Sequence, residues 1–291
     1  MRDIQNEEDT REVPLQKVGV KNVKYPVFVL DKTKKNQSTT ATVNLFVNLP
    51  KNFKGTHMSR FIEVFHKYHT DISMHNFLEM LEEIRIKLDA QRAFGRISFP
   101  YFIEKEAPVT HSKGIMQYQC SYEGESSEAE TASVQGSTAS VHDSVVSAQG
   151  STASGASSAS HGQTSSRFFV SIEVPVATLC PCSKAISEYG AHNQRGTVKV
   201  KLLYTEFFWI EDVISMIEEC ASVPLYSVLK RQDEKAVTEH AYDNPRFVED
   251  VVREVYIGLK NMNFKWFTVE CTNYESIHFH DAYACAQYDD L

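Results

Sequence analysis

The feature that most constrains the fold is a pattern of alternating and helical hydrophobic residues that occurs twice along the chain. In each half, two alternating stretches are followed by two helical stretches and then by two further alternating stretches. Alternation of apolar and polar residues predicts strands with one buried face, and apolar residues three and four positions apart predict helices that pack by one face. The predicted strands cover 20–30, 40–49, 96–104, 114–122, 168–176, 196–205, 264–272 and 282–288, and the predicted helices begin near Met58, Phe77, Ile210 and Val248.

Each half therefore predicts a module of strand, strand, helix, helix, strand, strand. Consecutive strands joined by short turns form antiparallel sheets, and helices in these positions would cover one face of a four-stranded sheet. Such a sheet leaves edge strands that need partners. We predict an α+β fold in which two tandem modules, at 17–122 and 167–291, have antiparallel sheets that continue into a neighbouring subunit.

Between the halves lies a low-complexity segment at 123–166, dominated by Ser, Ala, Gly and Thr, in which QGSTAS occurs twice. This composition cannot bury enough apolar surface to offset the entropy lost on ordering. We predict a disordered insertion here, with a partner-binding tail as the alternative, and a polar N-terminal arm at 1–16. Because loop-closure entropy grows slowly with length, such an insertion should leave both modules intact.

Charge and composition limit the classes of function. The 291 residues carry a formal net charge of −8, which argues against a nucleic-acid coat, because phosphate backbones are bound by clustered Lys and Arg. The N-terminus is acidic and polar, and no stretch approaches the roughly 18 apolar residues of a membrane span. We therefore expect a cytoplasmic protein that binds neither nucleic acid nor a membrane.

The stretch LCPCSKAISEYGAHNQRG combines two thiols and an imidazole. Cys180 and Cys182 follow a predicted strand, Pro181 stiffens the turn between them, and His192 comes ten residues after the second cysteine. In a reducing compartment such a cysteine pair indicates a metal or catalytic site rather than a disulfide. We expect one sulfur to bind a metal ion and the other to act as a nucleophile, favoured by a cation such as Lys184, although the spacing does not say which is which.

Further candidate residues lie in other parts of the chain. His278 and His280 would share a face of a strand or converge in a loop, and Cys, His and carboxylate ligands suit zinc or iron with one position open to water. The alternative is that these histidines are ordinary surface residues. The other cysteines fit small buried side chains; they are Cys120, Cys220, Cys271 and Cys285.

The stretch KGTHMSRF places His57, Ser59 and Arg60 at the start of a predicted helix. Backbone N–H groups, a hydroxyl and a guanidinium at a helix N-terminus can bind an anion. Helix capping alone would explain Thr56 equally well.

Several long motifs, taken together, resemble those of the type IB GTP cyclohydrolase family. They are LCPCSKxISxYxAHNQRG, KGTHMSRF, VTExAYxNPxFVED and ESIHxHxA, and they occur in the family's order. The resemblance covers nearly the whole chain except the N-terminal arm and the insertion. It implies a tunnelling fold with two such modules per chain, and homotetramers with active sites at subunit interfaces.

The resemblance also implies a reaction and a metal site. GTP would be hydrolysed at C8 of guanine, lose that carbon as formate and close to 7,8-dihydroneopterin triphosphate, the first step of folate and deazapurine synthesis. A divalent metal, zinc before manganese or iron, would be held by Cys180, His192 and Glu234. Where the family commonly has Pro, this chain has Gln232, so the loop that carries Glu234 is expected to be less rigid.

The remaining roles follow from the same resemblance. Cys182 would meet the reacting purine carbon, and His278 and His280 would move protons. Glu249 would accept the N–H donors of the guanine edge. The triphosphate would be bound by His57, Ser59 and Arg60.

Three other functions would require different sequence features. A deazapurine nitrile reductase of the same fold uses a cysteine and NADPH but no metal, so it would not require Cys180 or His192. A zinc-dependent nucleobase deaminase would need a P-C-x-x-C motif, which this stretch lacks. A non-catalytic binding module with a closed structural zinc site would need four protein ligands.

Overall fold

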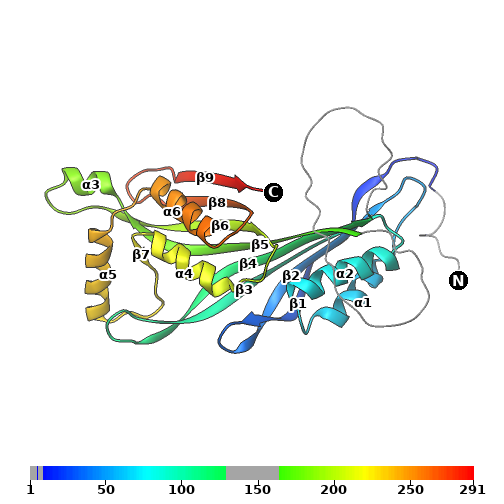
Figure 1. The fold of residues 1–291 in the computed structure, drawn as a ribbon, viewed down its shortest axis with the longest axis horizontal. Coiled ribbons are helices and arrows are strands. Elements are labelled where there is room, and N and C mark those ends of the chain that lie inside the picture. The colour runs from blue at the N-terminus through cyan, green and yellow to red at the C-terminus, as the bar shows by residue number, and fades with distance from the viewer. Residues whose placement is uncertain (1–4, 6–8, 129–163) are drawn as a thin grey trace.

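The computed structural model describes Gln5 and residues 9–128 and 164–291, which form one sheet with helices packed against it (Figure 1). In chain order the elements are β1 (Leu15–Asp31), β2 (Lys35–Leu49), α1 (Met58–Tyr68), α2 (Met74–Lys87), β3 (Arg92–Glu106), β4 (Lys113–Glu128), β5 (Thr164–Leu179), α3 (Pro181–Ile186), β6 (Asn193–Leu203), α4 (Ile210–Cys220), β7 (Val223–Pro224), α5 (Arg231–Asp243), α6 (Val248–Asn261), β8 (Trp266–Asn273) and β9 (Ala282–Asp289). Among the described residues, no helix has the length and apolarity needed to cross a membrane.

The described strands form a single antiparallel sheet in the order β1, β2, β3, β4, β5, β6, β8, β9, and the short β7 pairs with β5 beyond the end of β4. The pairing of β4 with β5 joins the two modules, so the sheet runs without a break through both. Its outer strands, β1 and β9, are open edges with unpaired backbone groups. Such edges are places where another chain can add to a sheet.

One face of the sheet forms the core. Buried and less buried residues alternate along β2, where Val43, Leu45 and Val47 have almost no exposed surface. Helices α1, α2, α4 and α6 cover this face, and their apolar stripes join the strands in a single hydrophobic cluster. Paired glycines let α2 approach closely: a Cβ on Gly95 or Gly124 would lie within 3 Å of the Leu81 or Phe77 side chain.

Buried polar contacts also tie the modules together. Lys105 of β3 donates to Glu218 of α4 at 2.6 Å, and Tyr118 of β4 donates to the other oxygen of that carboxylate at 2.8 Å. Burial lowers the pKa of Lys105, while the adjacent carboxylate opposes the shift. Because removing either charge would leave the other buried without its partner, this pair fixes α4 against the first module.

The α+β class with two tandem modules is confirmed, but the second module is more elaborate than predicted. Beyond its two predicted helices it contains α3, the short β7 and α5. Their apolar patterns are weak because they are short or largely exposed, so periodicity did not reveal them. The prediction that the outlying cysteines are buried holds for Cys120 and Cys271 but is wrong for Cys285, which is exposed on β9.

The predicted bounds of the insertion are also wrong at both ends. Strand β4 continues to Glu128 and β5 begins at Thr164, and these two residues are partners in the ladder. Ladder hydrogen bonds join backbone groups, so a serine-rich sequence can extend a hairpin without adding to the core. Residues 129–163, the rest of the predicted insertion, lie outside the described part of the chain.

Candidate active site

The sheet register brings the first two candidate metal ligands together. Strand β5 ends at Leu179, opposite Asn193 at the start of β6. The residues just beyond this pair are Cys180 and His192, and the Cys180 N–H donates to the His192 carbonyl at 3.1 Å. Two residues that are twelve positions apart in sequence are therefore neighbours across the end of an antiparallel ladder.

Helix α3 then sets the positions of the two thiols. Pro181 occupies its first turn, where the missing N–H costs nothing, and Cys180 is the N-cap, whose sulfur accepts the Ser183 N–H at 3.5 Å. Ser183 further accepts the His192 N–H at 3.2 Å through its hydroxyl, which also donates to the Cys180 carbonyl. Cys180 is half-buried and Cys182 is exposed, so the two sulfurs have different surroundings.

Lys184, the cation expected to favour a thiolate, contacts helix α5. Its ammonium donates to the backbone carbonyl of Tyr242 at the end of α5 and lies 4.2 Å from the centre of the Tyr242 ring. The lysine therefore joins α3 to α5 by a hydrogen bond and a cation–π contact.

The loop between β8 and β9 brings the remaining histidines to the same end of the sheet. The Tyr274 N–H donates to the Arg195 carbonyl at 2.8 Å, and Ser276 Oγ lies 3.1 Å from His192 Nδ1. The rings of His278 and His280 stack with their centres 5.3 Å apart, and both are exposed. Sequence analysis did not single out Ser183 or Ser276, although both belong to the quoted motifs.

The two singled-out glutamates lie on different helices. Glu249 is in the first turn of α6, and the segment that leads into this helix is tied to the end of β5 by a 3.1 Å bond from Arg246 N–H to the Leu179 carbonyl. Glu234 is in the first turn of α5, and its side chain is exposed. That first turn lies beside the turn between β3 and β4, where Asp233 accepts the Thr110 N–H at 2.8 Å.

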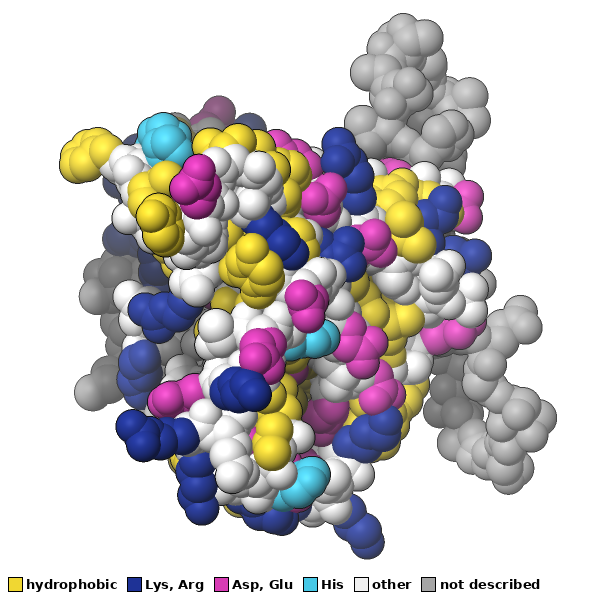
Figure 2. Space-filling model, turned by 90° about the vertical axis from the view of Figure 1, so that its left-hand side faces the viewer, with side chains coloured by type: hydrophobic (Ala, Val, Ile, Leu, Met, Phe, Trp, Pro, Cys, Tyr) yellow, Lys and Arg dark blue, Asp and Glu magenta, His cyan; other side chains and the backbone are white. Residues whose placement is uncertain are grey.

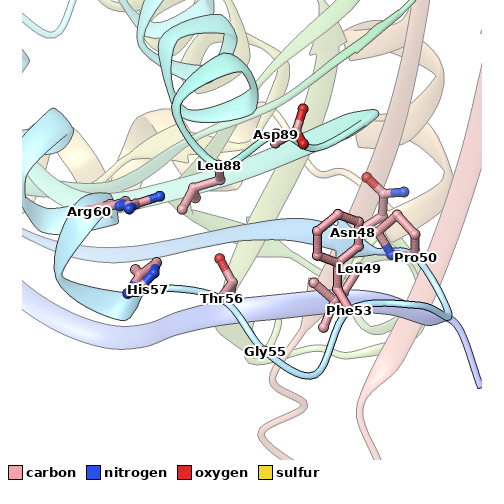
Figure 3. A pocket seen from close by; sticks show the side chains of 10 residues that line it. All are labelled: Asn48, Leu49, Pro50, Phe53, Gly55, Thr56, His57, Arg60, Leu88 and Asp89. Atoms are coloured by element: carbon pink, nitrogen blue, oxygen red, sulfur yellow. The ribbon is translucent and has the colours of Figure 1, made fainter. Parts of the chain in front are cut away.

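The predicted anion segment lies at the opposite end of the sheet. His57 and Arg60 line a pocket of about 260 Å³ together with Thr56, Asn48 and Asp89 (Figure 3). The pocket adjoins the end of β2. Through the ladders from β2 to β5, this end of β2 lines up with the start of β5, whereas Cys180 follows the end of β5 (Figure 1). The N-cap of α1 is His57 rather than Thr56, so capping does not account for Thr56. Ser59 does not line the pocket.

Comparison with known proteins then decides the family. A family model described as type I GTP cyclohydrolase folE2 matches residues 1–148 and 134–284. The chain is 46% identical over 289 residues to GTP cyclohydrolase FolE2 of Syntrophotalea carbinolica, covering 99% of this chain and 95% of that protein. This chain belongs to the type I GTP cyclohydrolase family, as a FolE2 member. A second FolE2, from Thermosipho africanus, is 45% identical over 292 residues, 100% of this chain and 99% of the relative.

A solved structure shows the same fold at low sequence identity. A hyperthermostable mutant of Bacillus sp. TB-90 urate oxidase superposes with a TM-score of 0.50 at 8% identity, over 94% of this chain and 98% of that one. This FolE2 chain therefore has the tunnelling fold, with its modules in tandem and one continuous antiparallel sheet.

Membership of this family indicates a metal-dependent enzyme, and only some of the expected ligands fit one ion within a single chain. Cys180 and His192 do, because they are neighbours and thiolate and imidazole both suit zinc. Glu234 does not join them within one chain: eight residues, or about 12 Å along a helix axis, separate it from Tyr242, where α5 meets α3. In the described part of the chain, no group of three His, Cys, Asp or Glu side chains is placed to hold a metal ion.

Proposed function

We propose that the protein is a type IB GTP cyclohydrolase that converts GTP and water to 7,8-dihydroneopterin triphosphate and formate in the cytoplasm. The observation that carries the proposal is the full-length match to FolE2 relatives together with the cluster at the end of β5. In that cluster a half-buried cysteine adjoins a histidine, and an exposed second cysteine lies on the same short helix.

The metal of this enzyme would be held by Cys180, His192 and Glu234, with zinc as the first choice. When bound, a divalent ion of this kind makes water acidic enough to supply hydroxide near neutral pH. In the chain itself, the hydroxyls of Ser183 and Ser276 contact the backbone N–H and the Nδ1 atom of His192. The Ser276 contact would fix the ring orientation, as outer partners of metal-binding histidines commonly do.

The chemistry at guanine would be carried by residues that surround this cluster. Cys182 is exposed and would contact the purine carbon that is lost as formate. His278 and His280 would transfer protons during ring opening and ribose rearrangement, a task suited to imidazole at neutral pH. Glu249, exposed at the start of α6, would accept the N–H donors of the guanine edge and so select guanine over adenine.

The triphosphate would be bound by His57, Ser59 and Arg60 of an adjacent subunit. Two observations support a triphosphate site on a second chain. The pocket lined by His57 and Arg60 and the cysteine cluster lie at opposite ends of one chain, and the edge strands β1 and β9 are open to pairing. A homotetramer in which sheets join into barrels would bring the two ends of neighbouring chains together.

The test is to incubate the pure protein with GTP and assay formate and, after oxidation, a fluorescent pterin. We expect equal amounts of both products, loss of turnover after treatment with a chelator, and recovery on addition of a divalent metal. Turnover that survives complete metal removal, or consumption of NADPH with a deazapurine nitrile in place of GTP hydrolysis, would overturn the proposal.

A further inference from the structure

Helix α3 carries Cys182 but packs little apolar surface against the rest of the chain. None of its six residues is buried, and the Ile186 side chain is 85% exposed. Figure 2, which looks onto the end that carries α3 and α5, shows hydrophobic side chains protruding at its upper left. Because most helices in proteins are stabilised by packing of an apolar face, the position of α3 must depend on a few polar contacts.

The first of these contacts hold the start of α3 at the end of the sheet. The Cys180 N–H donates to the His192 carbonyl, and the Ser183 hydroxyl accepts the His192 N–H. Both contacts are made with the same residue, so they place the N-terminus of α3 but do not by themselves fix its rotation. A further contact is needed to set the direction in which the side chains of this short helix point.

Lys184 supplies that contact. Its ammonium donates to the Tyr242 carbonyl and lies 4.2 Å from the centre of the Tyr242 ring. Tyr242 is in the last turn of α5, where backbone carbonyls have no partner within the helix and carry the negative end of its dipole. One cation therefore binds a carbonyl and an aromatic face together. Among the described residues, this is the one hydrogen bond from α3 to another helix.

The helix that Lys184 contacts is itself fixed at both ends. Asp233, in the first turn of α5, has no exposed surface, and its carboxylate accepts four hydrogen bonds. Just beyond the other end of α5, the Asn244 side chain donates to the Ala221 carbonyl at 2.9 Å. The Lys184–Tyr242 contact therefore joins α3 to a rigid part of the fold.

Helix geometry makes this contact a constraint on Cys182. An α-helix has 3.6 residues per turn, so side chains two positions apart point about 200° apart around its axis. Lys184 follows Cys182 by two positions. When Lys184 is directed at α5, Cys182 is directed away from it, and the thiol is exposed. The ammonium and the thiol thus lie on opposite sides of α3.

From these contacts we infer that Lys184 is a positioning residue for the nucleophile. By contacting Tyr242 it fixes the rotation of α3, and so the direction of the Cys182 thiol relative to Cys180 and His192. The inference rests on the proposed function for the role of Cys182. Lys184 acts through the placement of α3 rather than through its charge, because its ammonium is engaged by α5. A nucleophile displaced by about 1 Å from its reacting carbon can lose on the order of 100-fold in rate.

Substitutions on both sides of the contact test this inference. Lys184→Met keeps the length of the side chain but removes the cation, and we expect kcat for GTP to fall about 10- to 100-fold while KM changes less than about threefold. Zinc content should stay at the wild-type level, because Cys180 and His192 keep their own contacts. Lys184→Arg retains a cation and a donor, so it should recover most of the lost kcat.

The partner residue provides the decisive control. Tyr242→Leu removes the aromatic face, and we expect kcat to fall about 3- to 10-fold, with no additional fall when it is combined with Lys184→Met, since both variants lose the same contact. Tyr242→Phe keeps the ring face and should match the wild type. Falls that multiply in the double variant, or a Tyr242→Leu variant with unchanged kcat, would overturn the inference, because Lys184 would then act on the substrate or the thiol directly.

Hydrogen exchange gives a readout that does not depend on GTP turnover. The Lys184 and Ser187 N–H groups donate to the Cys180 and Ser183 carbonyls at 3.2 and 3.0 Å. We expect both N–H groups to exchange about tenfold faster in Lys184→Met, while the amides of α5 exchange at the wild-type rate. Unchanged exchange in α3 would contradict the inference. A wild-type protein that fails to hydrolyse GTP would refute the proposed function instead, and the exchange data would still decide whether Lys184 holds α3.

Discussion

At the scale of single residues, the two thiols of the Cys-Pro-Cys stretch have different surroundings. Cys180 is half-buried at the N-cap of α3 beside His192, and Cys182 is exposed two residues further on, in the first turn of the helix. We predict that Cys182→Ala lowers kcat for GTP by at least about 1000-fold, because a nucleophile is lost, while zinc content stays at the wild-type level. Steady-state kinetics and metal analysis of the same sample provide the check. Loss of zinc in this variant would mean that the roles of the two sulfurs are reversed.

A second prediction at this scale concerns Glu249. Its exposed position in the first turn of α6 means that few contacts within the chain depend on its charge. We expect Glu249→Gln to weaken GTP binding about 10- to 100-fold, because hydrogen bonds to a charged acceptor are replaced by weaker ones, while the melting temperature changes little. Binding titration and thermal unfolding measure the two effects. Unchanged affinity would remove Glu249 from the purine pocket.

At the scale of elements, the contact between α5 and the β3–β4 turn should depend on pH. Burial opposes ionisation of Asp233, but hydrogen bonds led by those from Thr110 outweigh it and lower the pKa of the carboxyl in the folded state. The ionised group therefore stabilises the fold above its unfolded pKa of about 3.9, and this contribution is lost as the pH falls through the lower folded value.

The variant Asp233→Asn lacks this contribution at every pH. We expect its unfolding equilibrium constant to exceed that of the wild type by about tenfold at pH 7, and by clearly less at about pH 2, below the unfolded pKa of the carboxyl. Urea unfolding at both pH values measures the difference, with Glu239→Gln on the exposed side of the same helix as the control. An equal difference at both pH values would mean that the charge of Asp233 contributes nothing.

At the scale of the whole molecule, the ladder between β4 and β5 joins the two modules. These two strands flank residues 129–163 in the sequence. Glu128 and Thr164 are partners, so a two-residue Asn-Gly turn could connect β4 to β5 directly. We predict that replacing 129–163 by this turn preserves GTP turnover and raises stability by no more than about 2 kcal/mol, since loop-closure entropy changes slowly with length. Kinetics, thermal unfolding and sedimentation of the shortened chain are the measurements. A loss of activity with an intact oligomer would give the segment a functional role.

The sequence by itself determined much of this protein. Hydrophobic periodicity predicted the strands and the paired helices of both modules, because burial of one face repeats every two residues in a strand and every 3.6 in a helix. It also marked Cys180, Cys182 and His192 as a chemical site, since two thiols and an imidazole in a polar stretch have little use in a core. It did not reveal α3 and α5, whose short or exposed surfaces leave a weak pattern.

Only the tertiary structure decided which of these residues meet. The ladder between β5 and β6 joins Cys180 to His192, and the β8–β9 loop adds Ser276. The hydrogen bonds of Asp233 instead hold Glu234 at the far end of α5. Such placements depend on strand register and on contacts between distant segments, which local spacing does not encode, whereas secondary structure follows from the repeat of each element.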